Sequence, residues 1–475
     1  MFAKYAKKKL IPFAVISSLA VAGLSGNATM TEAKSDNAKH KKNEIENVIF
    51  LIGDGMGPVY NTAYRSYKDD KSTPYMEKTA FDEYLLGAQE TYSWDTEESI
   101  TDSAAAGTSM AAGIKTYNGA ISVNLEKNEV KTVLEEAKEN NKATGLVSTS
   151  QINHATPASF GAHDESRNNY NDIADDYYDE MIDGAHKVDV LLGGGTAYFD
   201  RGDRDLTEEF QEDGYSYVTS KEELANDDND QILGLFAPKG MDKAIDRSEE
   251  TPSLSEMTDA ALERLSEDDD GFFLMVEGSQ IDWAGHDNDV VAAMSEMEDF
   301  EKAYEKAIEF AKKDKNTLVV TTADHSTGGF AMGRDGEYIW DPAPLKAAKK
   351  TPDFMAAKIA EGADVKATLT ENIDLDLTEE EIASVQEAAK TENTVEIDNA
   401  IEKIFDLRSG TGWTTGGHTG VDVNVYAYGP KSEEFIGLHD NHETGQLVMD
   451  LLNAKQDKDD DHDDDHKKDK KHKKD

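Results

Sequence analysis

The chain has 475 residues, and 97 acidic against 49 basic side chains give it a formal net charge of −48. This charge excludes a protein that binds nucleic acid through a basic surface. Hydrophobic residues make up 38% of the chain, enough for the core of one large domain or two ordinary ones. Because cysteine is absent, disulfides, thiol catalysis and thiolate-bound zinc are excluded. Any metal must be held by His, Asp, Glu or hydroxyl groups.

The amino-terminal segment is typical of a secretory signal. Lysines at positions 4, 7, 8 and 9 precede an apolar run from Leu10 to about Leu24, and small residues follow at positions 26–28. The run is shorter than the roughly 20 apolar residues that span a bilayer, so we expect no stable membrane anchor. Residues 1–28 are interpreted as a signal peptide and residues 29–46 as a flexible leader, which predicts a secreted protein, extracellular or periplasmic.

The carboxyl-terminal residues 456–475 are a low-complexity tail of Asp, Lys and His, and they are predicted to be disordered. His462 and His466 could capture metal ions weakly, but a solvated tail with no single role is the favoured interpretation. The acidic excess lies in the remaining body of the chain. There it fits adaptation to high salt and simple solubility about equally well.

Short apolar runs that end in polar residues indicate the fold. They are NVIFLIGDG at 47–55, TGLVSTS at 144–150, GFFLMVEG at 271–278 and TLVVTTADH at 317–325. Each is typical of a buried strand. Helical patterns lie between them, at 131–141 and 290–313 among others. The alternation predicts an α/β fold, a three-layer α/β/α sandwich with a central, mainly parallel sheet.

One segment departs from this alternation. Residues 340–409 are rich in Lys, Glu and Ala, carry helical patches and have no strand-end motif, so we expect an inserted helical segment over or beside the site. A final strand at 422–429 and a helix at 444–453 complete a single domain at 47–455.

Candidate ligands follow the predicted strands, where ligands bind in parallel sheets. Asp54 lies in GDGMG, whose small residues allow close approach of a ligand, and Asp324 and His325 follow the strand at 317. A carboxylate beside an imidazole can chelate a hard or borderline cation. Each motif alone is weak, because Gly and Asp are common in turns.

The segment EGSQIDWAGH is a stronger signal. Asp282 and His286 are four residues apart, so on a helix they share one face and can bind one metal ion. Glu277, at the end of the strand, can reach a neighbouring ion. The alternative interpretation, an ordinary helix start, has about equal weight for this segment in isolation.

Two further motifs add a nucleophile and an anion clamp. Ser103 in TDSAAAGT precedes small residues that suit a helix, whose N-terminus would stabilise an attached phosphate. Alone, a helix N-cap explains this serine better. The segment HATP contains His154 and Thr156, and Arg167 follows. Its planar guanidinium fits two phosphate oxygens, although a surface ion pair is the plain alternative.

Together the motifs GDGMG, TDSAAAGT, VEGSQIDWAGH, TADH and GGHTG, in this order from about residue 48 to 453, resemble the alkaline phosphatase family. The resemblance implies a catalytic domain that holds two Zn2+ and one Mg2+ per subunit. The ligands of the first zinc would be Asp282, His286 and His418. Those of the second, which also meets Ser103, would be Asp54, Asp324 and His325. The magnesium ligands would be Asp54, Thr156 and Glu277.

The resemblance also implies hydrolysis of small phosphate monoesters at alkaline pH. Ser103 would be the nucleophile that forms a phosphoserine, Arg167 would hold the phosphate, and Asp102 would orient the arginine. Two positions near the magnesium and the phosphate differ from the Asp and Lys of the enterobacterial members, namely His154 and Trp283. The identity of the third metal is therefore open, and loss of a positive charge predicts weaker inhibition by phosphate.

Two rival functions remain at this point. One is a phosphodiesterase or metal-dependent phosphomutase of the same superfamily, which shares metal ligands but tends to lack the serine motif and the arginine. The other is a secreted, acidic, metal-binding protein without catalysis. A homodimer is expected from the resemblance alone, and the sequence does not identify the physiological substrate.

Overall fold

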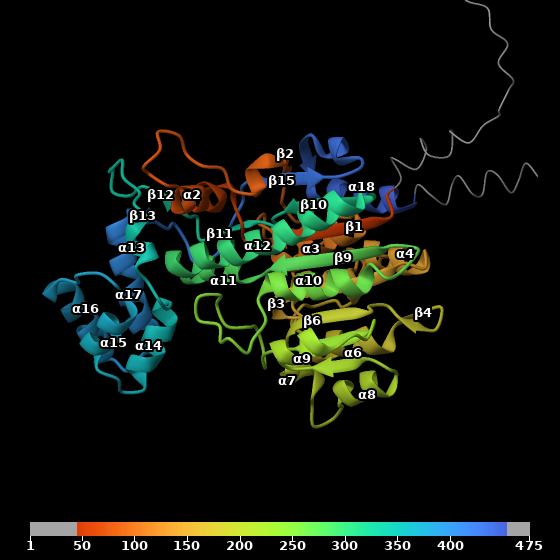
Figure 1. Cartoon of the computed structure of the whole chain (residues 1–475), viewed down its shortest axis with the longest axis horizontal. Coiled ribbons are helices and arrows are strands. Elements are labelled where there is room, and N and C mark those ends of the chain that lie inside the picture. Colours follow the sequence, from red (N-terminus) through yellow and green to blue (C-terminus); the bar gives the residue numbers. More distant parts are fainter. Residues whose placement is uncertain (1–44, 454–475) are drawn as a thin grey trace, which may run out of the picture. The chain divides into compact units, whose positions relative to one another are not determined.

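We analysed a computed structural model, which describes residues 45–453 (Figure 1). The predicted signal peptide, nearly all of the leader and the carboxyl-terminal tail lie outside the described residues. Within residues 45–453, no helix combines the length and the apolar composition needed to cross a membrane.

A ten-stranded sheet forms the centre of the fold. In spatial order its strands are β16 (Gly437–Asp440), β2 (Leu85–Glu90), β15 (Val423–Tyr428), β10 (Thr317–Thr322), β1 (Asn47–Gly53), β9 (Phe272–Gly278), β3 (Ala143–Gln151), β6 (Val190–Gly194), β8 (Ile232–Leu235) and β7 (Ser216–Val218). Neighbouring strands are parallel except that β15 runs antiparallel to β10 and β2. The mainly parallel sheet predicted from the sequence is confirmed.

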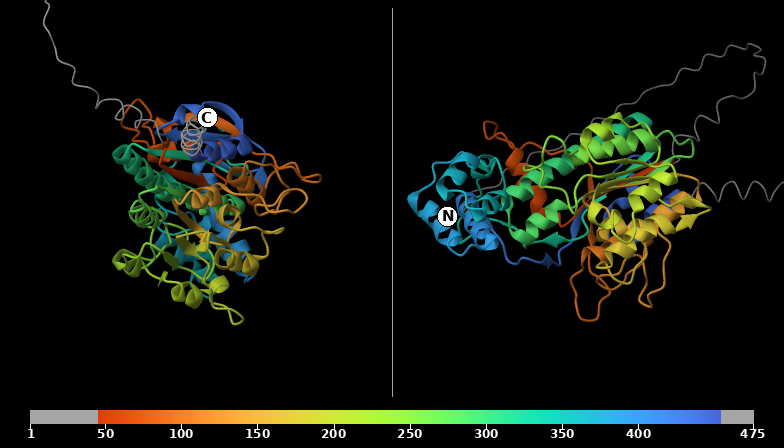
Figure 2. Two further views of the ribbon diagram at one scale, coloured as in Figure 1. Left: turned by 90° about the vertical axis from the view of Figure 1, so that its right-hand side faces the viewer. Right: turned by 90° about the horizontal axis from the view of Figure 1, so that it is seen from below.

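Each face of the sheet packs against its own layer of helices, because side chains alternate along a strand. In β1, Ile49 and Leu51 enter one hydrophobic core, whereas Val48, Phe50 and Ile52 enter the other. The first core is covered by α2 (Pro58–Lys68), α10 (Leu254–Leu265) and α12 (Val290–Asp314). The second is covered by α3 (Ser103–Ala112), α4 (Val133–Glu139), α5 (Ala155–Gly161), α6 (Tyr170–Asp179), α8 (Leu206–Glu212) and α18 (Asn441–Asn453). The result is the predicted three-layer sandwich (Figure 2).

Local signals explain where the predicted helices begin. The helix expected at 131–141 is α4, which starts at a capping box between Thr132 and Glu135. The helix expected at 290–313 is α12, and Asp289 caps it by accepting hydrogen bonds from the backbone of Val291 and Ala292. α4 is two residues shorter than expected at each end, and α12 begins at the expected residue and ends one residue later.

The segment 340–409 is helical and its helices group together beyond α11 (Gln280–Asp287), as Figure 1 shows. Its members are α13 (Ala343–Lys346), α14 (Pro352–Ala360), α15 (Val365–Asn372), α16 (Glu379–Ala389) and α17 (Thr394–Ser409). Their buried side chains, among them Met355, Ile397 and Phe405, join the same core that α12 covers. The segment is therefore attached to the helical layer that leads to the candidate site.

Short elements complete the described chain. Two small antiparallel pairs are β11 (Ser326–Thr327) with β14 (His418–Thr419), and β12 (Ala331–Met332) with β13 (Thr411–Gly412). The other short elements are η2 (Phe81–Glu83), β4 (Met181–Ile182), β5 (Ala185–His186), α7 (Thr196–Phe199), α9 (Lys221–Asn226) and η3 (Ser432–Phe435). The first pair matters for function, because it brings His418 back to the end of β10.

Candidate active site

Three neighbouring strands deliver carboxylates to one edge of the sheet. Asp54 follows β1, Glu277 is in β9, and Asp324 follows β10. β1 lies between the other two strands in parallel register, with Ile52 opposite Glu277 on one side and Thr322 on the other. All three carboxylates are fully buried. Burial of this much negative charge is costly unless cations compensate it.

The three residues that the family resemblance assigns to the first zinc lie close together. Asp282 and His286 lie one turn apart on α11, with Oδ2 and Nε2 separated by 3.3 Å. Nε2 of His418 lies 3.1 Å from Nε2 of His286. The other ring nitrogen of each histidine contacts a backbone carbonyl, Gly416 O at 2.7 Å from His286 and Thr101 O at 2.8 Å from His418. Both Nε2 atoms are thereby directed toward a shared position.

The first group is also the more open one, since His286 is exposed and His418 is partly exposed. The Asp282 carboxylate raises the pKa of His286 to about 9, whereas burial lowers that of His418 to about 4. Thr327 contributes a contact that the sequence did not indicate, because its hydroxyl donates to Asp282. An open position beside three protein ligands is typical of a catalytic metal site.

The second predicted group is deeper. Asp54, Asp324 and His325 each offer one atom within 4.8 Å of the others, and all three residues are fully buried. Nε2 of His325 lies 3.1 Å from Asp324 Oδ2 and 3.2 Å from Ser103 Oγ. Burial, and then the charge of Asp324, raises the pKa of Asp54 well above its ordinary value. A dication here would offset that repulsion and reach the serine.

A third group contains Asp54 and Glu277 together with His154, whose ring offers an atom within 4.8 Å of theirs. Sequence reasoning placed His154 beside the site and Thr156 among the ligands. The structure buries both side chains, and it makes His154 a candidate ligand in its own right. Burial lowers the pKa of His154 to about 3, so the ring is neutral and able to donate a lone pair.

Glu277 is held by serines that the sequence did not single out. Its Oε2 accepts hydrogen bonds from Ser148 and Ser279, both at 2.6 Å, and from Ser150 at 3.3 Å. Its Oε1 is buried, as are both carboxylate oxygens of Asp54, and these atoms have no hydrogen-bond partner among residues 45–453. Oriented carboxylates with unused buried oxygens fit hard cations such as magnesium.

Ser103 is the first residue of α3, and its side chain is buried. The N-cap interpretation of this serine is wrong, because Asp102 caps the helix by accepting from Ala105 N at 2.9 Å. Ser103 Oγ is thus not used as a helix cap. It faces His325 at the positive end of the helix.

Arg167 contacts Asp102 and the candidate ligand His154. Its Nη1 donates to Asp102 Oδ2 at 3.0 Å, and its Nη2 lies 3.2 Å from Nε2 of His154. The Trp283 ring meets the His154 ring edge-on at a centroid distance of 5.7 Å. Both positions that differ from the enterobacterial pattern therefore contact each other, beside the arginine.

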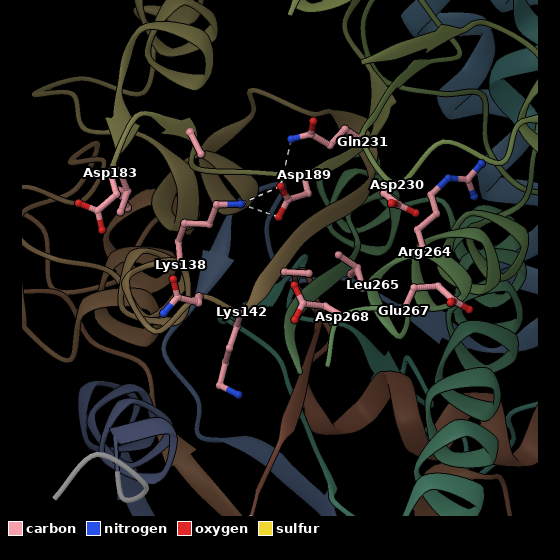
Figure 3. Close-up of a pocket in the computed structure, with 14 residues that line it drawn as sticks. Lys138, Lys142, Asp183, Asp189, Asp230, Gln231, Arg264, Leu265, Glu267 and Asp268 are labelled. Atoms are coloured by element: carbon pink, nitrogen blue, oxygen red, sulfur yellow. Dashed lines mark hydrogen bonds and ion pairs between the residues drawn. The ribbon is translucent and has the colours of Figure 1, made fainter. Parts of the chain in front are cut away.

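The cavity drawn in Figure 3 is separate from this site. It has a volume of about 540 Å³, and its lining includes Ala143, Asp189 and Gln231, at the amino ends of β3, β6 and β8. Lys138 pairs with Asp189 there at 2.7 Å. The candidate ligands follow the carboxyl ends of strands, so the two regions occupy opposite edges of the sheet. A smaller cavity of about 400 Å³ is lined by Asp102 and His418 of the candidate site.

A serine at a helix start, an arginine and three groups of metal ligands at the carboxyl edge of an α/β sandwich are the arrangement of a metal-dependent hydrolase. The chain belongs to the alkaline phosphatase family, whose family model matches residues 45–454. It is 60% identical over 448 residues to alkaline phosphatase 3 of Bacillus subtilis (strain 168), covering 94% of this chain and 97% of that protein.

Solved structures agree with this assignment. The cold-active alkaline phosphatase of a psychrophilic Shewanella sp. has 40% sequence identity and a TM-score of 0.80, over 86% of this chain and 99% of that one. A variant of the alkaline phosphatase from the Antarctic bacterium TAB5, with Mg bound in its M3 site, has 32% identity and a TM-score of 0.63, over 86% and 98% of the two chains. The chain is accordingly a metal-binding phosphatase, which excludes the non-catalytic interpretation.

Proposed function

We propose that this phosphatase hydrolyses phosphate monoesters at alkaline pH through a phosphoserine on Ser103, releasing inorganic phosphate. The position of Ser103 Oγ carries the proposal. It lies 3.2 Å from Nε2 of His325, at the N-terminus of α3. Serine is a weak nucleophile at its free pKa, so it needs activation by a cation and benefits from a high pH.

We propose two Zn2+ and one Mg2+ for the three ligand groups. The histidines of the first and second groups suit zinc. For the third group, magnesium rests on the oxygen atoms of Asp54, Thr156 and Glu277, which the resemblance assigns to it. Cations held there would stabilise charge on the attacking and leaving oxygens and lower the pKa of a bound hydroxyl or water. The TAB5 variants with Mg bound in the M3 site carry Glu or Asp in place of a histidine. They support magnesium at carboxylate ligands, whereas the third group here contains the His154 imidazole where the enterobacterial pattern has a carboxylate.

The proposed reaction has two steps, and Ser103, Arg167 and Asp102 each have a role in it. Ser103 Oγ forms a bond to phosphorus while the bond to the ester oxygen breaks, and the alcohol leaves with the proton that serine gives up. Water then cleaves the Oγ–phosphorus bond and restores the serine. Arg167 binds two phosphate oxygens through its planar guanidinium, and Asp102 keeps that group in place. Two displacements predict net retention of configuration at phosphorus.

The test is phosphate release from an aryl phosphate at alkaline pH, after chelation and after return of zinc and magnesium. We expect activity to return only with metal, and Ser103→Ala to lose about a thousandfold or more in kcat while binding the same metals. Metal content by mass spectrometry is the control for folding. Full activity of the alanine variant would refute the nucleophilic role.

The same assay separates the rival within the superfamily. A matched aryl diester should be hydrolysed far more slowly than the monoester, because Arg167 and the cations are placed for a dianionic group. Faster turnover of the diester would contradict the monoesterase proposal and favour the phosphodiesterase function.

We also propose that the protein is secreted and forms a homodimer. Secretion rests on the signal-like residues 1–28, and the dimer on family resemblance. Cell fractionation with amino-terminal sequencing of the mature protein tests the first, and light scattering of the purified enzyme tests the second. A mature chain that still begins at residue 1, or a monomeric mass, would contradict them.

A further inference from the structure

A second group of carboxylates lies outside the catalytic ligands, where the helical segment meets the end of α11. We define it as the insertion cluster, and its members are Asp287, Asp353, Asp398 and Glu402. Oxygens of the first three all lie within 4.8 Å of one another. They come from separate elements, since Asp287 ends α11, Asp353 is in the first turn of α14, and Asp398 is on α17.

Two members of the cluster are buried, and each has one carboxylate oxygen without a hydrogen-bond partner. Asp398 is 3% exposed and Glu402 is 5% exposed. Asp398 Oδ1 and Glu402 Oε1 have no hydrogen-bond partner within the described part of the chain. They are four residues apart, so they lie on one face of α17. Glu402 takes no part in the contact among the other three members, so its buried, unpartnered oxygen is a second and separate observation that points to a ligand.

The local charges do not compensate the cluster. Over residues 45–453, no Lys or Arg forms an ion pair within 4.0 Å with any of the four carboxylates. Lys243 acts on Asp398 only through its charge at longer range. Burial and neighbouring acidic groups raise the pKa of Asp398 to about 9 and that of Glu402 to about 11. Either protons or a cation must reduce this repulsion.

We propose that the insertion cluster binds a calcium ion, which fastens the helical segment to the end of α11. The three mutually close carboxylates can supply up to six of the six to eight oxygens that calcium takes, and Glu402 lies one turn further along α17. The exposed side chain of Asp353 leaves a path for the ion and its water ligands. Zinc is disfavoured because the cluster offers no nitrogen or sulfur ligand. Magnesium is disfavoured because it requires a stricter octahedral geometry.

The location gives the ion a structural consequence. Asp287 directly follows His286, so an ion held between Asp287 and α17 fixes the end of the helix that carries His286 and Asp282. The catalytic ligands of the first group would then be positioned from outside the catalytic site. This consequence rests on the proposed function, whereas calcium binding itself does not.

The experiment is calorimetric titration of calcium into enzyme that is already loaded with zinc and magnesium, in excess magnesium and in chelator-treated buffer. We compare wild type with D398N/E402Q, which removes the two buried charges at nearly constant volume. The matched control is E380Q/E396Q, because both of its glutamates are exposed on α16 and α17 and the charge change is the same. The carboxyl-terminal tail is present in every protein, so its calcium binding cancels.

We expect wild type and control to bind one more calcium ion per chain than D398N/E402Q does. We also expect calcium to raise the Tm of the first two proteins by several degrees and to leave that of the double variant unchanged. Equal calcium stoichiometry in all three proteins, or a wild-type Tm that does not respond to calcium, would overturn the proposal and indicate protonated carboxylates.

If the double variant does not fold, D353N replaces it, because Asp353 is exposed and its loss leaves the buried residues in place. We expect about tenfold weaker calcium binding for D353N, and unchanged affinity would count against the site. The calcium readouts do not depend on turnover, so they are unaffected if the phosphoserine proposal fails.

Discussion

Arg167 Nη1 donates a 3.0 Å hydrogen bond to Asp102 Oδ2, and the other oxygen of the same carboxylate, Oδ1, caps α3. Gly119 N also donates to Oδ2 at 3.0 Å. One side chain therefore sets both the start of the helix that presents Ser103 and the position of the arginine. The two roles are separable by substitution, because asparagine can cap a helix but carries no charge.

We predict that Asp102→Asn and Asp102→Ala both raise KM and the inhibition constant for phosphate about tenfold, which is ~1.4 kcal/mol, because the guanidinium is no longer held. Only the alanine variant should also lose about 1 kcal/mol of stability through the missing cap. Steady-state kinetics and denaturant unfolding measure the two effects. Equal stability of both variants would argue against the capping role.

Trp283 packs against His154 beside Arg167, and the family resemblance matches it to a lysine of the enterobacterial members. We predict that Trp283→Lys tightens inhibition by inorganic phosphate about tenfold, since it adds one positive charge near the anion. Trp283→Phe is the control, because it keeps an aromatic ring beside His154 without adding charge. If the lysine variant has the wild-type inhibition constant, charge at this position does not explain phosphate affinity.

Gly55 is required by close packing against the first ligand group. Its φ is +68°, and an added Cβ would lie 2.8 Å from Asp282 Cα and 2.9 Å from Asp282 Oδ1. We predict that Gly55→Ala costs ~1–3 kcal/mol of stability and lowers zinc occupancy. Gly202→Ala serves as the comparison, because a Cβ there would meet nothing within 4 Å. Similar zinc content in both variants would contradict the prediction.

The insertion cluster predicts a pH dependence of stability. Asp398 and Glu402 have pKa values of about 9 and about 11 in the folded protein, above the ordinary 3.8 and 4.5. At pH values between the ordinary pKa and the folded-state pKa of each group, the native state holds more protons than the unfolded state. The unfolding free energy therefore falls as the pH rises through this range. Charged groups that act on these two carboxylates are Asp287, Asp289, Asp353, Asp406 and Lys243.

Without calcium, the Tm of wild type should therefore decrease from pH 6 to pH 9 more than that of D398N/E402Q. Added calcium should stabilise wild type more at the higher pH, because the ion competes with protons for the same oxygens. Thermal unfolding with and without calcium at both pH values measures this. A calcium effect that is the same at both pH values would count against shared ligands.

Features that depend on short-range order could be predicted from the amino-acid sequence. Apolar runs predicted strands β1, β3, β9 and β10 within one to three residues, because alternation and burial are properties of consecutive residues. The pairing of Asp282 with His286 followed from the helical repeat, and the structure places their side chains 3.3 Å apart. The family resemblance supplied the remaining ligands, all of which lie at the same edge of the sheet.

Relationships between distant segments could not be predicted in this way, because they depend on how the chain folds. His286 and His418 are 132 residues apart, and no local pattern indicates that the pairing of β11 with β14 brings their Nε2 atoms within 3.1 Å. The cap function of Asp102 and the place of His154 among the candidate ligands likewise depend on which neighbours pack against them. The insertion cluster could not be predicted from the sequence, because its carboxylates resemble every other acidic residue until folding buries them together. Burial and long-range contact turn ordinary charges into a site, and both exist only in the folded chain.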